Sequence, residues 1–138
     1  MSRPAPGPPV REHEYQRLLA IRTRLRAFER WSADRAAEHG LTGSQHQLLL
    51  AVRGHPDTDG PTVRQVSEYL FIRPNTAVEL VNRVVALDLL ARHGDPADHR
   101  AVRLRLTPEG ERRIRDLSAD HLEELSRLAP LLEDLGAT

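Results

Sequence analysis

The chain of 138 residues contains no cysteine and no lysine, and aromatic residues make up only 4% of it. Without cysteine the protein can form no disulfide, no thiolate metal site and no thiol redox sensor. Aliphatic side chains must fill most of the core, and the hydrophobic content of 39% is somewhat low for a self-sufficient globule. This composition favours a helical protein that completes its core with a second copy.

Long hydrophobic runs are also missing from the sequence. No stretch approaches the length of a membrane span, and the N-terminus lacks the apolar centre of a signal peptide. We therefore expect a soluble, cytoplasmic protein with no membrane partner. The length suits one ordinary domain, which we place at residues 11–138 after a disordered, Pro-rich arm at residues 1–10.

Basic and acidic residues are equal in number but unevenly distributed along the chain. The formal net charge is zero, and all 20 basic residues are arginine. Between residues 92 and 115 the basic side chains outnumber the acidic ones: they are Arg92, Arg100, Arg103, Arg105, Arg112, Arg113 and Arg115. From residue 116 onward acidic side chains predominate, so the neutral average hides a basic middle and an acidic tail.

A long helix is predicted over residues 11–39, which contain no internal glycine or proline. A seam of apolar and small side chains runs along it: Leu18, Ile21, Leu25, Phe28 and Ser32. The alternating spacing of this seam is suited to packing against another helix. A helix this long in so small a protein suggests dimerisation, and packing within one subunit is the alternative.

Two shorter helices with clear start signals come next. Thr42-Gly43-Ser44-Gln45 and Thr62-Val63-Arg64-Gln65 both match the capping box, in which threonine and glutamine side chains satisfy free backbone N–H groups. A further helix begins near Pro74, because proline suits the first helical position. The helices on either side of residues 71–73, joined by this tight turn, have the helix-turn-helix arrangement.

The helix over residues 73–87 has an apolar side and a polar side. At 100° per residue the apolar side carries Ala77, Leu80, Val81, Val84 and Leu87. The polar side carries Asn75, Thr76, Glu79, Asn82 and Arg83. Amide, hydroxyl and guanidinium groups are those that read base edges and phosphates. Taken alone, the helix fits an ordinary solvated face equally well, and its neighbours favour DNA binding.

A β-hairpin is predicted after this helix. Residues 89–92 form a short candidate strand, and the alternation of apolar residues with arginine over residues 102–106 indicates a half-buried second strand. Arg100 lies near the hairpin tip, where a guanidinium can enter the minor groove of A·T-rich DNA, and Asp98 is placed to orient it. The alternative is an exposed hairpin with a weak local ion pair.

The C-terminal region begins with Thr107-Pro108-Glu109, a clean helix start. Its apolar stripe contains Ile114, Leu117, His121, Leu125 and Leu128. Pro130 is expected to interrupt the pattern, so a short final helix with Leu131, Leu132 and Leu135 is predicted. We expect these segments to meet the first long helix, within a subunit or across a dimer.

Residues 41–114 resemble the multiple antibiotic resistance regulator (MarR) family of winged-helix transcription factors. The matching segments are LTGSQHQLLL, PTVRQVSEYL, NTAVELVNRV and DPADHRAVRLRLTPEG. The Asp-x-Arg of Asp98 and Arg100, followed by Leu-Thr-Pro-Glu-Gly, is the most specific combination. The implied fold is mainly α with a small β-hairpin wing: a winged helix-turn-helix lobe at residues 42–106 between dimerisation helices at residues 11–39 and 108–138.

The resemblance also implies a homodimer whose recognition helices enter successive major grooves of a pseudo-palindromic operator in double-stranded DNA. The DNA-binding residues carried over by position are Arg73, Asn75, Thr76, Glu79, Asn82, Arg83 and Arg100, with Asp98 orienting the wing. The dimer interface is expected to contain Leu18, Ile21, Leu25, Leu125, Leu128 and Leu132. Such proteins are usually repressors released by a small, often aromatic or phenolic, effector that binds between the dimer helices and the DNA-binding lobe.

The sequence departs from the common family pattern at three positions. Glu79 stands where a basic or polar residue is frequent, and an acid there repels phosphates unless it accepts a hydrogen bond from a cytosine amino group. Phe71 and Asp88 stand where many relatives have glycine, in the turn and before the first wing strand. The neutral net charge and Glu79 leave open an alternative, a winged-helix dimer that acts through protein contacts without specific DNA binding.

Other chemistry is not indicated. The histidines show no paired spacing on one helix and no cysteine partner, so we predict no metal site and expect scattered surface or capping histidines, with His121 at an interface. No nucleophile elbow, phosphate-binding glycine loop or paired catalytic motif occurs, so we expect no cofactor and no enzyme activity.

Overall fold

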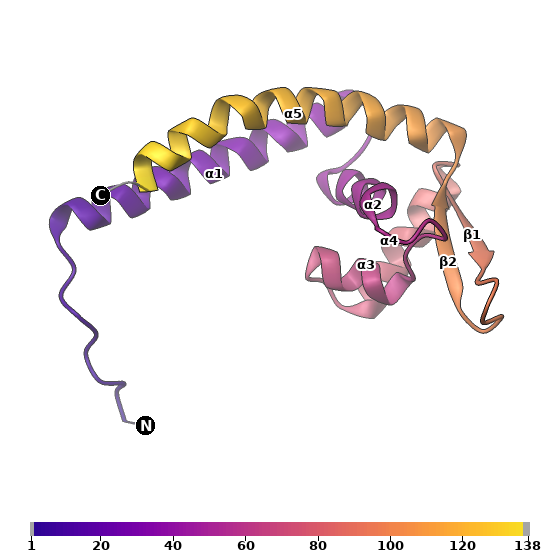
Figure 1. The fold of residues 1–138 in the computed structure, drawn as a ribbon, viewed down its shortest axis with the longest axis horizontal. Coiled ribbons are helices and arrows are strands. Elements are labelled where there is room, and N and C mark those ends of the chain that lie inside the picture. Colours follow the sequence, from indigo (N-terminus) through magenta and orange to yellow (C-terminus); the bar gives the residue numbers. More distant parts are fainter. Residues whose placement is uncertain (1, 137–138) are drawn as a thin grey trace.

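The computed structural model describes residues 2–136, which form a long helical pair and a smaller lobe (Figure 1). Helices α1 (Glu12–Glu38) and α5 (Pro108–Gly136) lie side by side and run in opposite directions. The lobe contains α2 (Gly43–Gly54), α3 (Val63–Leu70), α4 (Pro74–Ala86), β1 (Leu90–Gly94) and β2 (Val102–Leu106). The predicted architecture, mainly helical with a β-hairpin wing, is confirmed.

Outside these elements, residues 2–10 form no helix or strand and are exposed. None of the helices in the described part of the chain is long and apolar enough to cross a membrane.

Reciprocal side-chain caps begin α2 and α3, as the sequence predicts. The Thr42 hydroxyl accepts a hydrogen bond from the Gln45 backbone N–H at 3.1 Å, and the Gln45 amide oxygen accepts from the Thr42 N–H at 3.0 Å. Thr62 and Gln65 repeat this pattern at the start of α3. Each cap satisfies N–H groups that have no partner within the helix, which fixes where both helices begin.

The core of the lobe is made from the apolar faces of the helices and the inner face of the hairpin. From α4, Ala77, Val81 and Val84 are fully buried, and Leu104 of β2 is buried with them. Helix α5 adds its own first turns to this cluster: Ile114 and Leu117 are buried there. Because burying such a side chain contributes about 1.5–3 kcal/mol, the base of α5 is firmly attached to the lobe.

Two residues without glycine's freedom adopt left-handed backbone conformations. Phe71 has φ 55° in the turn between α3 and α4, and Asp88 has φ 59° before β1. These are the two positions at which the sequence departs from the glycine of many relatives. A side chain in this region costs about 1–2 kcal/mol, so both turns hold their geometry at an energetic cost.

Two local predictions were wrong. Leu87, expected on the core side of α4, is 49% exposed, because the helix ends at Ala86 and Leu87 lies at its C-cap. Pro130 does not end the last helix, which continues to Gly136.

Contacts on both sides of Pro130 keep α5 continuous. Leu128 and Leu131 line a groove with Phe28 of α1, and Leu132 beyond the proline is half-buried. An internal proline costs about 3 kcal/mol, and packing along α1 offsets this cost. Leu135, also expected here, lies outside the residues whose side chains the structure describes.

Candidate functional site

The polar face of α4 lies exposed and forms one wall of a groove. All five polar residues predicted for this face are exposed: Asn75, Thr76, Glu79, Asn82 and Arg83. Thr76, Glu79 and Arg83 line a cavity of about 410 Å³ together with Thr42 and Ser44 at the start of α2. The structure therefore brings the base-reading candidates together with the N-terminus of α2, whose N–H groups carry partial positive charge.

Three exposed arginines, two at α4 and one in the hairpin loop, have no ion-pair partner in the described part of the chain. Arg73 lies immediately before α4, Arg83 near its end, and Arg100 in the loop of the hairpin, and all three are exposed. An unpaired exposed guanidinium is available to a phosphate without first losing a protein partner. The arrangement can therefore supply positive charge to a nucleic acid from both the helix and the wing.

Asn82 is not available in the same way as its neighbours on α4. Its side-chain oxygen accepts a hydrogen bond from the guanidinium of Arg92, which belongs to β1. This contact joins the predicted recognition helix to the wing. We assigned no role to Arg92 from the sequence, because the fold alone brings a residue ten positions later back onto the helix.

Asp98 organises the backbone of the wing tip and not the guanidinium of Arg100. Its carboxylate accepts a hydrogen bond from the Arg100 backbone N–H at 3.0 Å, and its backbone carbonyl accepts from Ala101 at 3.0 Å. Both contacts close a tight turn that directs the chain around Arg100. The orienting role of Asp98 therefore stays a prediction, and the contact available for it is this backbone turn.

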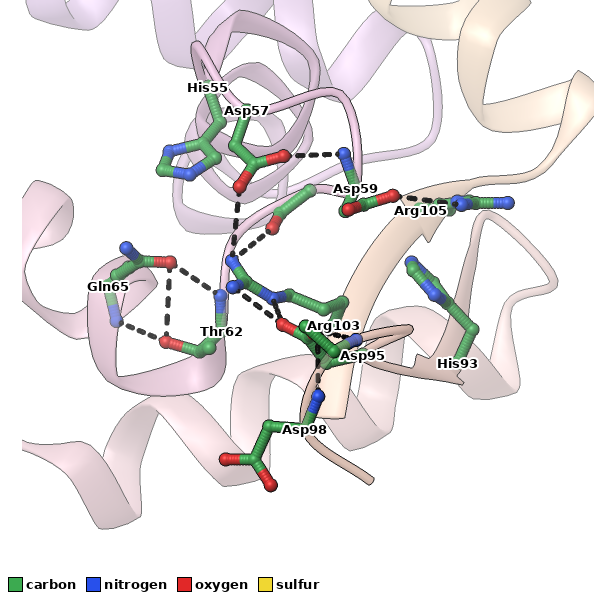
Figure 2. A network of polar contacts seen from close by, with 12 residues as sticks. His55, Asp57, Asp59, Thr62, Gln65, His93, Asp95, Asp98, Arg103 and Arg105 are labelled. Carbon is green, nitrogen blue, oxygen red and sulfur yellow. Dashed lines mark hydrogen bonds and ion pairs between the residues drawn. The ribbon is translucent and has the colours of Figure 1, made fainter. Parts of the chain in front are cut away.

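A polar network fixes the hairpin where β1 ends and the wing loop begins (Figure 2). The Asp95 carboxylate accepts hydrogen bonds from the backbone N–H of Ala97 at 2.7 Å and from the Arg103 guanidinium at 2.8 Å. Arg103 also donates to the Gly60 carbonyl at 3.0 Å and lies near Asp57. The N–H of Ala97 and then Arg103 hold the pKa of Asp95 below its usual range.

The same network ties the wing to the loop between α2 and α3. Beside the Arg103 contact, the Leu104 N–H donates to the Pro61 carbonyl at 2.9 Å. Gly60 has φ +87°, and a Cβ added to it would lie 1.9 Å from the Leu104 carbonyl oxygen. Only glycine allows this close approach, so the loop is held against β2 along its backbone.

The second candidate site is a cavity between α1, α2 and α5. Its volume is about 780 Å³, and apolar side chains such as Leu25, Phe28 and Leu125 form most of its wall. Two histidines, His46 of α2 and His121 of α5, also line it, with their ring centroids 4.6 Å apart. Such a large apolar concavity with few polar groups is typical of small-molecule sites.

The two histidines of this cavity differ in their hydrogen bonding. His121 is bonded at both ring nitrogens, through Nδ1 to the Leu117 carbonyl at 2.7 Å and through Nε2 to the Ser32 hydroxyl at 2.6 Å. His46 is only 4% exposed, and its Nδ1 has no partner. Burial, with His121 and then His39 nearby, lowers the pKa of His46 to about 4, so its ring is neutral at pH 7.

The expectation of a scattered surface or capping position was wrong for His46. Helix periodicity contains the missed signal, since His46 precedes the buried Leu49 by one helical turn. His121 lies where the aromatic side chains of α1 meet α5: its ring centroid is 4.8 Å from that of Trp31. Within residues 2–136 no group of three or more histidine, aspartate or glutamate side chains is arranged to hold a metal ion.

The residues predicted for a dimer interface divide into two groups. Leu18, Leu25 and Leu125 are exposed on the helical pair. Ile21 of α1 and Leu128 and Leu132 of α5 are half-buried. Part of the predicted seam thus packs within the chain, as Ser32 does against His121.

Comparisons with known proteins agree on one family. The sequence profile of the MarR family matches residues 39–101. The uncharacterized HTH-type transcriptional regulator YsmB of Bacillus subtilis is 36% identical over 64 residues, which are 46% of this chain and 44% of that regulator. The chain therefore matches less than half the length of this relative.

Solved structures extend the likeness to the flanking helices. A MarR family transcription regulator, SP03579, superposes with a TM-score of 0.72 at 26% identity over 84% of this chain and 75% of its own. The MepR–DNA complex of S. aureus gives a TM-score of 0.70 at 20% identity over 86% and 84%. Proteins of this kind are transcription regulators and not enzymes. The lobe, the wing and these matches lead to one assignment: residues 39–101 match the MarR family, and the chain has the fold of MarR family transcription regulators.

Proposed function

We propose that the protein is a homodimeric regulator that binds a pseudo-palindromic site in double-stranded DNA and represses transcription until a small ligand releases it. The observation that carries this proposal is the exposed polar face of α4, together with Arg73, Arg83 and Arg100, which have no ion-pair partner among the described residues. Phosphate contacts from these side chains position α4, and its polar face then reads bases in the major groove.

Base reading is assigned to Asn75, Thr76 and Glu79, which lie in the exposed first half of α4. Asn82 acts through Arg92, whose guanidinium it holds beside the helix. Glu79 accepts a hydrogen bond from a cytosine amino group and so contributes to sequence specificity. Its negative charge also repels the DNA phosphates, which lowers the affinity for DNA in general. The solved complex of MepR with DNA, a fold relative, shows this fold engaged with a duplex.

Dimerisation is proposed through the helical pair. Leu18, Leu25 and Leu125 are among the exposed leucines of α1 and α5, and the last two also line the cavity. A second copy buries such a surface, since soluble monomers rarely leave a large apolar patch exposed. Two lobes related by a two-fold axis then present their α4 helices to two half-sites.

Effector release is assigned to the cavity between α1, α2 and α5. The cavity is bounded on one side by the helical pair and on the other by α2 of the lobe. A ligand that binds there with different affinity in two lobe positions shifts the equilibrium between DNA-binding and non-binding states. Its apolar wall fits a small aromatic or phenolic molecule.

The test is binding of the purified protein to DNA upstream of its own gene, measured by fluorescence anisotropy against scrambled DNA at two salt concentrations. Selective, salt-weakened binding supports the proposal. Weak, equal binding to both duplexes leads to a selection from random sequences. Failure of that selection supports the alternative, a winged-helix dimer acting through protein contacts, which Glu79 and the neutral net charge favour.

A further inference from the structure

Residues 2–10 form an arm before α1 and are exposed throughout. Four of the ten prolines of the chain lie in this arm: Pro4, Pro6, Pro8 and Pro9. Proline fixes its own φ at about −65° and biases the residue before it toward extended geometry, so the arm favours the polyproline II conformation. That conformation has three residues per turn, which places Arg3, Pro6 and Pro9 on one face.

Helices α2 and α3 carry an exposed aromatic surface on the lobe. Two hollows of about 330 and 390 Å³ adjoin there, and Tyr69 lines both. Leu50 of α2 lines the first hollow, and His55 and Glu68 line the second. Leu50 and Tyr69 are each 49% exposed. These four residues define what we call the Tyr69 surface, which offers apolar and aromatic walls to a partner.

Contacts within the chain prepare this surface for a basic partner. His55 fixes the Tyr69 ring, since its Nδ1 lies 2.8 Å from the Tyr69 hydroxyl oxygen. Glu68 is the one acidic side chain among the described residues that line the two hollows. Its ion pair with Arg64 is long, at 3.8 Å, and both side chains are exposed. Such a pair contributes little, so the Glu68 carboxylate can accept a second guanidinium.

The arm and the Tyr69 surface are complementary in shape and charge. Aromatic-lined hollows bind proline rings of a polyproline II segment, which loses little entropy because it is already ordered. Pro9 and Pro6 can fill the two hollows in turn, and Arg3 then reaches Glu68. The chain direction agrees with this order, because the first hollow shares Leu50 with the cavity beside α1 and the second lies beyond Tyr69.

An arm cannot reach the Tyr69 surface of its own chain. Only Val10 and Arg11 connect the last proline to α1, and two residues span at most about 7 Å. The first residue of α1 that lines the cavity with Leu50 is Leu25, which lies about 20 Å along the helix from its start. Figure 1 shows the arm leaving α1 at the end of the helical pair that is away from the lobe.

A second copy brings an arm and a Tyr69 surface together, and this step rests on the proposed dimer through the helical pair. Let the two α1 helices run antiparallel about a two-fold axis between the exposed Leu18 and Leu25. The start of one α1 then lies beside about residues 24–38 of the other, the stretch that lines the cavity next to Leu50. We propose that the proline-rich arm of each copy binds the Tyr69 surface of the other copy, with Arg3 paired to Glu68.

The test uses the full chain, in which an introduced cysteine is the only one to react with a nitroxide label. A spin-labelled Ser2→Cys copy is mixed with unlabelled, ¹⁵N-enriched wild type, so that NMR detects only contacts between copies. We expect loss of amide signal intensity from residues 64–70 of the enriched copy and none from the wing loop at residues 95–101. Gel filtration shows whether the mixed sample is dimeric. A monomer disproves the dimer as well, whereas a dimer without signal loss in α3 overturns the docking alone.

Charge reversal tests the pairing of Arg3 with Glu68. Arg3→Glu in the labelled copy places a like charge opposite Glu68, so the signal loss in α3 should decrease severalfold. Glu68→Arg in the enriched copy should then restore it, because the two charges are opposite again. Failure of the second substitution to restore the signal loss contradicts the pairing.

A truncation tests the aromatic wall. Tyr69→Ala removes the side chain that both hollows share and should abolish the signal loss in α3. Val78→Ala is the matched control, since Val78 is similarly exposed, at 45%, but belongs to α4. Signal loss that survives both Arg3→Glu and Tyr69→Ala shows that the arm passes near α3 without binding this surface, and overturns the proposal. Circular dichroism establishes that each variant keeps its fold.

Discussion

Protonation of His46 should destabilise the fold as the pH falls, and the structure gives the size and direction of this effect. The ring is buried and its pKa lies at about 4 in the folded protein, against 6.5 in an unfolded chain. Between these values the unfolded state binds the proton more readily. The stability that His46 contributes is therefore complete above pH 6.5 and is lost as the pH falls toward about 4.

The expected magnitude follows from the two pKa values. At about pH 5 the difference in proton binding corresponds to about 1–2 kcal/mol of stability. This exceeds the error of a careful denaturation experiment on a small protein. It also applies twice in a homodimer, once for each copy of the ring.

The measurement is urea unfolding of the wild type and the His46→Phe variant at several pH values between about 7 and 4.5, at fixed protein concentration. Carboxylates and the remaining histidines titrate in both proteins, so the difference between the two curves isolates His46. We expect the free energy of unfolding of the wild type to fall relative to that of the variant as the pH falls. The burial argument is refuted if the two free energies of unfolding differ by the same amount at every pH, or if the wild type becomes relatively more stable as the pH falls.

Three further substitutions test other parts of the structure. Arg100→Ala should weaken operator binding about tenfold, or about 1.4 kcal/mol, and leave the oligomeric state unchanged; equal affinity in anisotropy titrations contradicts the role of the wing. Phe71→Gly should raise the free energy of unfolding by about 1 kcal/mol, because the side chain is 96% exposed and the left-handed backbone conformation suits glycine. A lower free energy of unfolding in urea would instead show that the Phe71 ring makes a stabilising contact. Gly60→Ala should lower stability by about 2 kcal/mol or more, since its Cβ would meet the Leu104 carbonyl, whereas Gly54→Ala, with open space around it, serves as the control; similar unfolding midpoints for the two variants contradict the steric argument.

Local signals in the sequence were sufficient to predict most elements of the fold. The capping boxes at Thr42 and Thr62 depend on residues three positions apart, and both form as expected. The apolar side of α4 also follows from helical periodicity, apart from Leu87 at its end. Such features are predictable because neighbouring residues alone determine them.

Contacts between distant segments were beyond the reach of the same reasoning. The Asp95–Arg103 pair depends on the hairpin register, and its contact with Gly60 joins positions 43 residues apart. The pairing of His46 with His121 requires α5 to cross α2. The continuity of α5 through Pro130 likewise depends on α1, since packing against a second helix offsets the local cost of proline.

The backbone contact between β2 and the loop after α2 also determines how the lobe can move. Pro61 and Gly60 hold β2 against the loop before α3, and Arg92 of β1 is hydrogen-bonded to Asn82 of α4, so these contacts oppose independent movement of the wing and α4. Ile114 and Leu117 of α5 are buried in the core of the lobe, so the first turns of α5 must move together with it. In the proposed two-fold dimer, a small tilt of the lobe together with this part of α5 becomes a change in the separation of the two α4 helices, so we expect an effector to alter the half-site spacing that the dimer can match.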